Sequence, residues 1–258
     1  MSLLEAILLG LIQGLSEFLP VSSSVHLLVF HHIFGITSED NMTFIIMLNM
    51  GSLIPLLWVF RKDVWALIKN PFQKMTALLI IATLPLIIVT LLFQDFIESM
   101  FHLVYFLPFG FVITGIALLL SDKVKKNDKD VSELKFLDAV LIGLAQAFAV
   151  FPGLSRSGST ITASLTRGLD RENAAKFSFL MSIPAAFGAI ALRIGHIVSG
   201  RILLDDLNFV NLAAGFVTAA VTGYLAINFM LAIVKKAKLK YFALYYIFAL
   251  AIFVFVMF

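Results

Sequence analysis

The sequence predicts an all-α integral membrane protein with six transmembrane helices and two broken re-entrant helical hairpins. Hydrophobic residues make up 60% of the 258 residues, and the mean hydropathy of +1.00 exceeds what a soluble core requires. Apolar runs of about 20 residues, the length that crosses the hydrocarbon layer, recur along the chain. Two further apolar segments are interrupted by prolines and polar side chains. Together these observations exclude an ordinary soluble domain.

The uninterrupted runs are the expected full spans, and they cover about 42–60, 75–94, 101–120, 176–197, 209–234 and 239–258. The interrupted segments cover about 2–34 and 134–169 and contain Pro20 and the pair Pro152-Gly153, which stop a helix and free backbone groups. Broken backbone at membrane depth is tolerated only where protein or trapped water satisfies it. We therefore expect each interrupted segment to be a re-entrant hairpin that lines a cavity.

Lysine and arginine are concentrated in four loops, which predicts that these loops lie on the cytoplasmic side. The loop residues are Arg61, Lys62, Lys69, Lys74; Lys123, Lys125, Lys126, Lys129, Lys135; Arg167, Arg171, Lys176; and Lys235, Lys236, Lys238, Lys240. This layout predicts a multi-pass protein of the inner (plasma) membrane, with segment 2–34 entering from outside and segment 134–169 from the cytoplasm. Arg193 and Arg201 fall near the outer face. The net charge of +3 follows from the loops and does not indicate nucleic-acid binding.

The same layout predicts an internal repeat within a single membrane domain, 1–258. Residues 1–121 and 134–258 each contain one hairpin followed by three spans, joined by a polar linker at 122–133. Three spans reverse the entry side, so the two repeats are expected to be inverted. Inverted repeats with broken helices place the binding site at the repeat interface near the midplane. The local sequence echo between residues 10–13 and 143–146 is weak, and chance similarity between apolar segments competes with it.

The first interrupted segment carries Gln13 and Glu17, four residues apart and therefore on one face of a helix. Hard cations such as Mg²⁺ and Ca²⁺ take oxygen ligands, and Mg²⁺ commonly uses one or two carboxylates together with phosphate oxygens. Glu17 is thus a candidate metal or diphosphate ligand. Alternatively, Glu17 caps the next half-helix or pairs with Arg156, and Gln13 makes an ordinary interhelical hydrogen bond.

A hydroxyl cluster, Ser22, Ser23 and Ser24, follows Pro20, and His26 lies shortly beyond it. Hydroxyls and unpaired backbone N–H groups at a helix start bind phosphate oxygens. A histidine can serve as general acid or base near neutral pH. The serines could equally be helix N-caps, and His26 could be only an interhelical hydrogen-bonding residue.

The second interrupted segment has the composition of a phosphate-binding loop. Gly153 lets backbone approach a ligand, Ser155, Ser157 and Thr160 supply hydroxyls, and Arg156 supplies a planar fork matched to phosphate. The likeness to a soluble phosphate loop is partial, because there is no Lys-Ser/Thr ending and no preceding strand. The alternative is that Arg156 pairs with Glu17 only to hold the repeats together.

These motifs resemble those of the bacterial undecaprenyl-diphosphatase family, also called the bacitracin-resistance protein family. That family is marked by (E/Q)xxxE, here residues 13–17, by a Leu-Pro-Val-Ser-Ser run and a histidine, here 19–23 and His26, and by PGxSRSxxT, here 152–160. Residues 173–184 resemble the segment that follows in the family, and the hydrophobic outline agrees over essentially the whole chain.

The resemblance implies hydrolysis of undecaprenyl diphosphate to undecaprenyl phosphate and inorganic phosphate at the outer face of the cytoplasmic membrane, with a divalent cation, Mg²⁺ or Ca²⁺. This reaction recycles the lipid carrier for peptidoglycan and confers resistance to bacitracin, which competes for the substrate. Glu17 would bind metal or diphosphate, Arg156 would clamp phosphate, Ser23 would be nucleophile or orienting hydroxyl, and His26 acid or base. The resemblance leaves open a serine or a water nucleophile, and a homodimer.

Four positions depart from the commonest family pattern: Gln13 replaces a glutamate, Val25 a glycine, and Ile45 and Asn49 stand where a glutamate and a glutamine are frequent. The loss of one carboxylate is expected to weaken metal binding. A second function also fits the pattern, namely a polyprenyl-phosphate flippase that binds without cleaving, because inverted repeats and re-entrant helices are transporter devices. The absence of cysteine excludes disulfides and thiolate metal sites.

Overall fold

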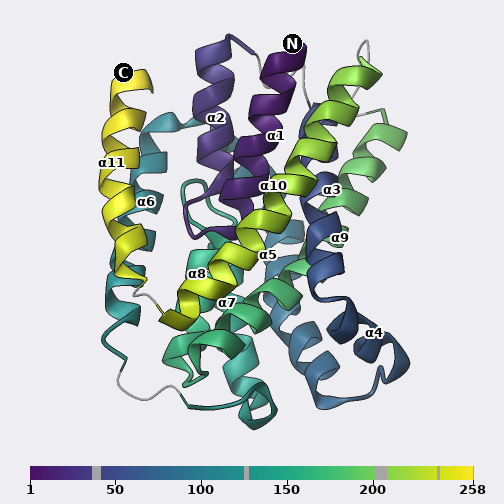
Figure 1. The fold of residues 1–258 in the computed structure, drawn as a ribbon, viewed down its shortest axis with the longest axis vertical. Helices are drawn as coiled ribbons and strands as arrows, with labels where there is room; N and C mark the ends of the chain where they lie inside the picture. The colour runs from purple at the N-terminus through teal and green to yellow at the C-terminus, as the bar shows by residue number, and fades with distance from the viewer. Residues whose placement is uncertain (37–41, 125–127, 201–207, 237–238, 258) are drawn as a thin grey trace.

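The computed structural model describes residues 1–36, 42–124, 128–200, 208–236 and 239–257 (Figure 1). Within these ranges the regular structure is helical, apart from one isolated backbone bridge between Lys129 and Leu169. The helices are α1 (Leu3–Phe18), α2 (Ser23–Phe34), α3 (Met42–Val59), α4 (Arg61–Lys69), α5 (Lys74–His102), α6 (Leu107–Ser121), α7 (Phe136–Phe148), α8 (Arg156–Thr166), α9 (Arg171–Val198), α10 (Phe209–Lys236) and α11 (Lys240–Met257), with short 3-10 turns at Val104–Phe106 and Val131–Glu133.

Helices long and apolar enough to cross a membrane occur where the sequence predicts them. Five are found within the described ranges, and a sixth is counted if α3 and α4, which are bent by 79° at their junction, form one span. The expected span at 42–60 corresponds to α3. The prediction of an all-α membrane protein is therefore confirmed, and the predicted number of six spans is reached when the bent pair α3–α4 is counted as one span.

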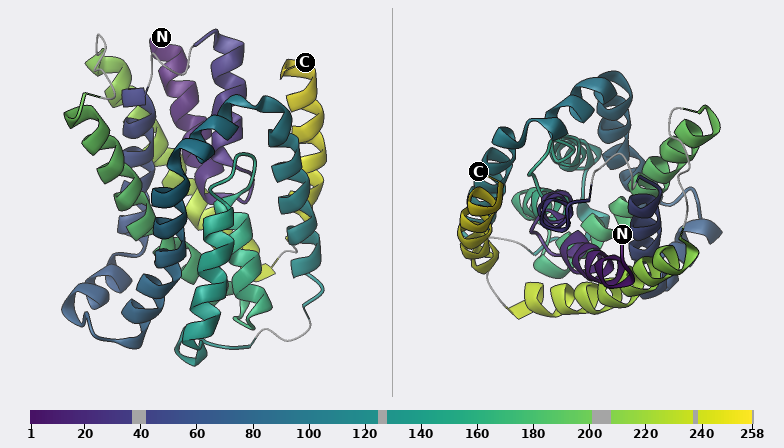
Figure 2. Two further views of the ribbon diagram at one scale, coloured as in Figure 1. Left: turned by 180° about the vertical axis from the view of Figure 1, so that it is seen from behind. Right: turned by 90° about the horizontal axis from the view of Figure 1, so that it is seen from above.

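The two interrupted segments form the expected helical hairpins. Their helices contain 16, 12, 13 and 11 residues, or about 24, 18, 20 and 16 Å, which is too short to cross about 30 Å of hydrocarbon. Hairpin α1–α2 enters from one end of the molecule and hairpin α7–α8 from the other, and their turns meet in the middle (Figure 1). Seen from above, the long helices surround the hairpins (Figure 2).

Both hairpins turn where proline interrupts the helix. Helix α1 ends at Phe18, two residues before Pro20, because the residue preceding a proline is disfavoured in the α region. Ser22, at the start of α2, has a φ of 66° and is the one non-glycine residue with positive φ among the described residues. This left-handed conformation is costly for a serine and marks a strained turn. In the second hairpin the corresponding position of strain is taken by Gly153, with a φ of 88°.

The first helix of each hairpin packs closely on a spanning helix of the other half. A Cβ added at Gly10 or Gly14 of α1 would collide with the backbone of α10, and one added at Gly143 of α7 would collide with the backbone of α5. Small residues at such contacts let two helices approach within a membrane, where van der Waals packing replaces the hydrophobic effect. Each half thus contributes a hairpin helix that packs on a spanning helix of the other half, as a two-fold relation between the halves would require. The inverted relation itself stays a prediction.

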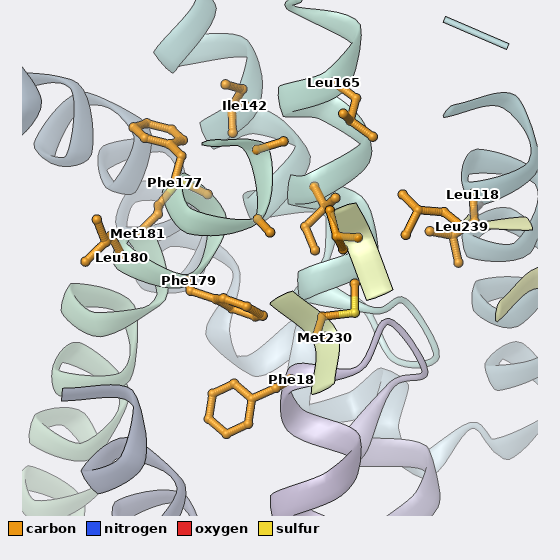
Figure 3. Packing of buried hydrophobic residues seen from close by; sticks show 14 of the residues in the cluster. Phe18, Leu118, Ile142, Leu165, Phe177, Phe179, Leu180, Met181, Met230 and Leu239 are labelled. Atoms are coloured by element: carbon orange, nitrogen blue, oxygen red, sulfur yellow. The ribbon is translucent and has the colours of Figure 1, made fainter. Parts of the chain in front are cut away.

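Buried aromatic and aliphatic side chains fix the inner end of α1. Phe18 and Phe179 of α9 lie edge to face, with ring centroids 5.9 Å apart, and Met230 of α10 lies in the same cluster (Figure 3). Phe18 is only 2% exposed. Because Phe18 follows Glu17 directly, this packing holds the carboxylate-bearing turn of α1 in one position.

The described parts of the four basic loops lie at one end of the molecule, opposite both chain termini (Figure 1). Ion pairs fasten them: Arg171 Nη2 lies 2.6 Å from Asp122 Oδ1, and Lys176 Nζ lies 2.6 Å from Asp63 Oδ1. This clustering agrees with the predicted cytoplasmic side. Lys125, Lys126, Arg201 and Lys238 lie outside the described residues.

Candidate active site

The two hairpin turns bring Glu17 and Arg156 together from positions 139 residues apart. Glu17 lies in the last turn of α1 and Arg156 is the first residue of α8. Arg156 Nη2 forms an ion pair and hydrogen bond with Glu17 Oε1. The other carboxylate oxygen, Oε2, accepts hydrogen bonds from Ser23 Oγ at 2.7 Å and from Gln13 Nε2 at 3.2 Å. Three predicted site residues therefore converge on one carboxylate.

The polar group extends to α3, where Asn49 Oδ1 accepts a hydrogen bond from Gln13 Nε2 at 3.1 Å. The Gln13 amide thus donates to both Glu17 and Asn49. The expected face-sharing of Gln13 and Glu17 is confirmed by their hydrogen bond. Asn49, which stands where the family commonly has a longer amide, completes a chain of oxygen and amide groups across α1 and α3.

The surrounding backbone makes this point of the membrane electropositive. Helices α2 and α8 both begin here, and the unsatisfied N–H groups of a helix start carry partial positive charge. Arg156 adds a full charge that Glu17 balances. The two side chains are 25% and 20% exposed, so both are desolvated in part and both remain reachable.

Glu17 and Arg156 line a partly open cavity of about 260 Å³, whose lining residues come from α1, α3, α5, α8 and α9. Its polar lining also includes Asn49, Ser52, Ser182 and Arg193, and its apolar lining is Phe18, Ile46, Leu53, Leu56, Leu86, Ala185, Ala186, Ala189 and Ile190. The cavity therefore combines a charged end with walls that suit an aliphatic chain.

The hydroxyls of the second segment are bonded within the protein. Ser155 Oγ caps α8 by accepting from Gly158 N at 3.1 Å, Ser157 Oγ donates to Leu19 O at 3.0 Å, and Thr160 Oγ1 lies 2.5 Å from Ser178 Oγ. The Ser157 bond joins the second hairpin directly to the turn of the first. These contacts hold Arg156 in place, whereas phosphate binding by these hydroxyls stays a prediction.

Gly153 lies against Gly110 of α6, and a Cβ on either glycine would overlap the backbone of the other segment. Gly153, which was expected to let the backbone approach a ligand, lets the turn pack closely against α6. The backbone N–H of Ser155 donates to Thr114 Oγ1 of the same helix at 3.1 Å. Helix α6 therefore supports the loop that presents Arg156.

His26 is held by partners outside the carboxylate cluster. Its Nδ1 lies 2.7 Å from Ser22 O and its Nε2 lies 2.5 Å from Tyr245 Oη, while the ring stacks on Tyr245 with centroids 5.8 Å apart. His26 does not line the cavity described above. Its predicted role as acid or base stays a prediction, and the structure adds Tyr245 of α11 as its partner.

The remaining serines of the first turn are placed differently from one another. Ser22 is buried and Ser24 exposed, and their hydroxyls lie 3.4 Å apart. Val25, which replaces the usual glycine, lies inside α2 and is 1% exposed in the hydrophobic core. The unusual backbone falls at Ser22 instead, so Val25 is compatible with the observed turn.

Sequence reasoning did not assign Asn49, Ser182, Arg193 or Tyr245 to the site. The available signal was a polar residue within an apolar span, which Asn49, Ser182 and Arg193 each provide. Arg193 was expected only as a basic residue near the outer face, and the structure places it on the same cavity as Arg156.

The cavity lining offers oxygen donors to a divalent cation. Within the described residues, no three His, Cys, Asp or Glu side chains gather as a metal cluster. Glu17, with its carboxylate, and Asn49, with its amide, both line the cavity. One carboxylate and a neutral oxygen fit a hard cation such as Mg²⁺, which completes its coordination with phosphate and water.

Comparison with known proteins agrees with this geometry. A family model described as bacitracin resistance protein BacA matches residues 6–253. An undecaprenyl-diphosphatase of Carboxydothermus hydrogenoformans is 42% identical over 252 residues, covering 98% of this chain and 96% of the relative. Undecaprenyl-diphosphatase 4 of Bacillus thuringiensis (strain Al Hakam) is 42% identical with the same coverage, and the undecaprenyl-diphosphatase of Methanobrevibacter smithii is 38% identical over 266 residues, covering 95% and 94%.

The match therefore extends over both hairpins and all of the spanning helices. It includes every residue of the carboxylate cluster. The chain belongs to the bacitracin resistance protein BacA family.

Proposed function

We propose that this protein hydrolyses undecaprenyl diphosphate to undecaprenyl phosphate and inorganic phosphate. The observation that carries the proposal is the Glu17 carboxylate, which binds a serine hydroxyl and a guanidinium at the edge of a partly apolar cavity. The family and the names of the relatives support the same reaction. A flippase is not favoured, because none of the relatives described above is named for lipid transport.

Charge stabilisation in this reaction falls to Arg156 and the two helix starts. The guanidinium fork matches phosphate oxygens in geometry and charge, and the N–H groups at the starts of α2 and α8 favour anions. As the bridging P–O bond breaks, negative charge grows on the leaving lipid phosphate and on the transferred group. Fixed donors stabilise that charge without reorganising.

Proton transfer falls to Glu17. Ser23 Oγ donates a 2.7 Å hydrogen bond to Glu17 Oε2, which is the arrangement of a nucleophile and its base. In one route Ser23 attacks the terminal phosphorus, Glu17 takes the hydroxyl proton, and water then hydrolyses the phosphoserine. In the other route Glu17 deprotonates a water that attacks directly. Acid-quenched protein carrying phosphate on Ser23 would establish the first route.

A divalent cation, Mg²⁺ or Ca²⁺, is part of the proposal, with Glu17 and Asn49 as its protein ligands. When bound, the cation would neutralise charge on the phosphate oxygens. Gln13 orients both ligands through its amide donors.

The proposed setting is the cytoplasmic membrane, with the site open to the periplasmic or extracellular side. The clustered basic loops at the opposite end support this orientation. In that setting the reaction would recycle the lipid carrier for cell-wall synthesis, and bacitracin would compete for the lipid substrate. Homodimer formation stays a prediction from the resemblance.

The test is inorganic phosphate release from undecaprenyl diphosphate by the detergent-purified protein, with Mg²⁺, with Ca²⁺ and with chelator. Release that requires metal and is lost in folded Glu17→Ala and Arg156→Ala proteins is expected. Lys176→Gln serves as the control, because it removes a charge near the start of α9, at a residue that pairs with Asp63 and does not line the cavity. Movement of uncleaved lipid across vesicles, without phosphate release, would favour the flippase instead.

A further inference from the structure

Helix α4 leaves the bundle sideways at the end of the molecule that carries the basic loops (Figure 1). Its axis is bent by 79° from that of α3, so α4 lies close to the membrane plane if α3 crosses the membrane. Val64 and Leu67 pack against the hydrophobic core, and Asp63 pairs with Lys176 of α9 at 2.6 Å. None of the residues of α4 is fully buried. One face of the helix is therefore fixed to the protein, and the other faces lipid or water.

The exposed face of α4 continues the apolar outer surface of α3. Ile54 and Trp58 are exposed one helical turn apart near the end of α3, and Trp58 is 60% exposed. Trp65, at 58%, and Ile68 are exposed on α4, and Phe72 is fully exposed just beyond it. Apolar side chains on the outside of a spanning helix contact acyl chains, and tryptophan is enriched where acyl chains meet headgroups. The continuity of this surface therefore favours lipid as its occupant.

Basic side chains accompany the exposed aromatic rings of this region, namely Arg61, Lys62 and Lys69. The Arg61 guanidinium carbon lies 5.0 Å from the ring centre of Trp58, and Lys69 Nζ lies 5.5 Å from that of Trp65. Long basic side chains lay their stems along apolar surface and keep the charge at headgroup level. The one carboxylate among residues 61–69 is already paired with α9, as described above. The exposed face therefore combines apolar bulk with positive charge, which is complementary to an anionic lipid.

We propose that α4 and its flanking aromatic residues form a surface that binds anionic phospholipids of the proposed cytoplasmic leaflet. The aromatic and aliphatic side chains enter the boundary between headgroups and acyl chains, and the three cations contact the lipid phosphates. One basic side chain near an anionic surface favours binding about fivefold, so the cations select anionic over zwitterionic headgroups. Since no residue of α4 lines the cavity, the proposal is independent of the hydrolysis proposed above.

The tryptophans provide a direct measurement, because the chain has two, Trp58 and Trp65, and both belong to this surface. The purified protein is reconstituted into vesicles of equal parts phosphatidylcholine and phosphatidylglycerol, with bromine on the acyl chains of one lipid or of the other. The overall composition is the same in both preparations, so a difference in fluorescence quenching reports which lipid lies beside the tryptophans. Brominated phosphatidylglycerol should quench at least about twofold more strongly.

The double variant Lys62→Gln/Lys69→Gln removes two charges and keeps both tryptophans. Its preference for brominated phosphatidylglycerol should fall close to equality, while bromine on both lipids together should still quench it as in the wild type. The control Lys123→Gln/Lys135→Gln removes the same charge from exposed residues outside α4 and should keep the wild-type preference. Melting temperatures of the reconstituted proteins establish that each variant is folded.

Equal quenching of the wild type by the two brominated lipids would refute the selection of anionic lipid. An unchanged preference in folded Lys62→Gln/Lys69→Gln would refute it too, because the cations of α4 would then not be its cause. Weak quenching by both brominated lipids, together with strong quenching by acrylamide in the aqueous phase, would place Trp58 and Trp65 in water. That outcome would overturn the lipid-binding surface and leave the exposed face of α4 to a soluble partner.

Discussion

The ion pair between Glu17 and Arg156 can be dissected with Glu17→Gln, Arg156→Met and the double variant. Each single change leaves one charge without its partner in a site where both side chains are about a quarter exposed or less. Complete burial would make that loss about 3–5 kcal/mol, and we expect about 1–2 kcal/mol after allowing for the exposure. The double variant has no uncompensated charge, so most of the lost stability should return.

Activity should behave differently from stability. Glu17→Gln keeps the shape of the side chain but cannot accept the nucleophile's proton, which should lower kcat at least about 100-fold, or ~3 kcal/mol in activation free energy. Arg156→Met removes the phosphate clamp, with a loss of similar order. If the two groups act as one unit, the double variant should be about as inactive as either single variant.

The assay pairs phosphate release with thermal unfolding of the same detergent preparations. Recovery of stability without recovery of activity assigns the pair to catalysis. An active double variant with a native melting temperature would refute this reasoning, because the pair would then serve only to hold the hairpins together. Retention of activity by Glu17→Gln would also remove the carboxylate from the proton transfer.

Three further changes have distinct outcomes. Gln13→Glu adds a second carboxylate beside Glu17, and it should preserve or raise activity and lower the Mg²⁺ concentration needed for half-maximal phosphate release; a large loss would show that the amide donor is required. Tyr245→Phe removes the Nε2 partner of His26, so kcat should fall by up to about tenfold with KM unchanged, whereas an unaltered pH–rate profile and kcat would exclude this pair from the reaction. Gly110→Ala drives a Cβ into the backbone of the α7–α8 turn and should destabilise the protein by about 1–3 kcal/mol, measured as a lower melting temperature; an unchanged melting temperature would show that the turn can shift.

The positions of the spans and of the hairpin breaks could be predicted from the sequence, because each depends on residues close together in the chain. Span length depends on bilayer thickness, and the hairpin breaks depend on Pro20 and on Pro152, whose effects on backbone act within a few residues. The same locality explains the confirmed pairing of Gln13 with Glu17, four residues apart on α1.

Contacts between residues far apart in the sequence could not be predicted in the same way, because the type of a residue does not say which residue it contacts. Ser155, Ser157 and Thr160 have the chemistry of a phosphate cradle, and the structure shows that the same hydroxyls form hydrogen bonds within the protein. Loops at membrane depth have many backbone groups to satisfy, so hydroxyls there serve structure as readily as ligands.

Arg193 illustrates the converse case. As one basic residue near the outer end of an apolar span, it reads in sequence as an interfacial anchor. The structure places it on the lining of the cavity that also contains Glu17 and Arg156. The cavity is therefore a property of two hairpins and three spanning helices together, and no single segment of the sequence describes it.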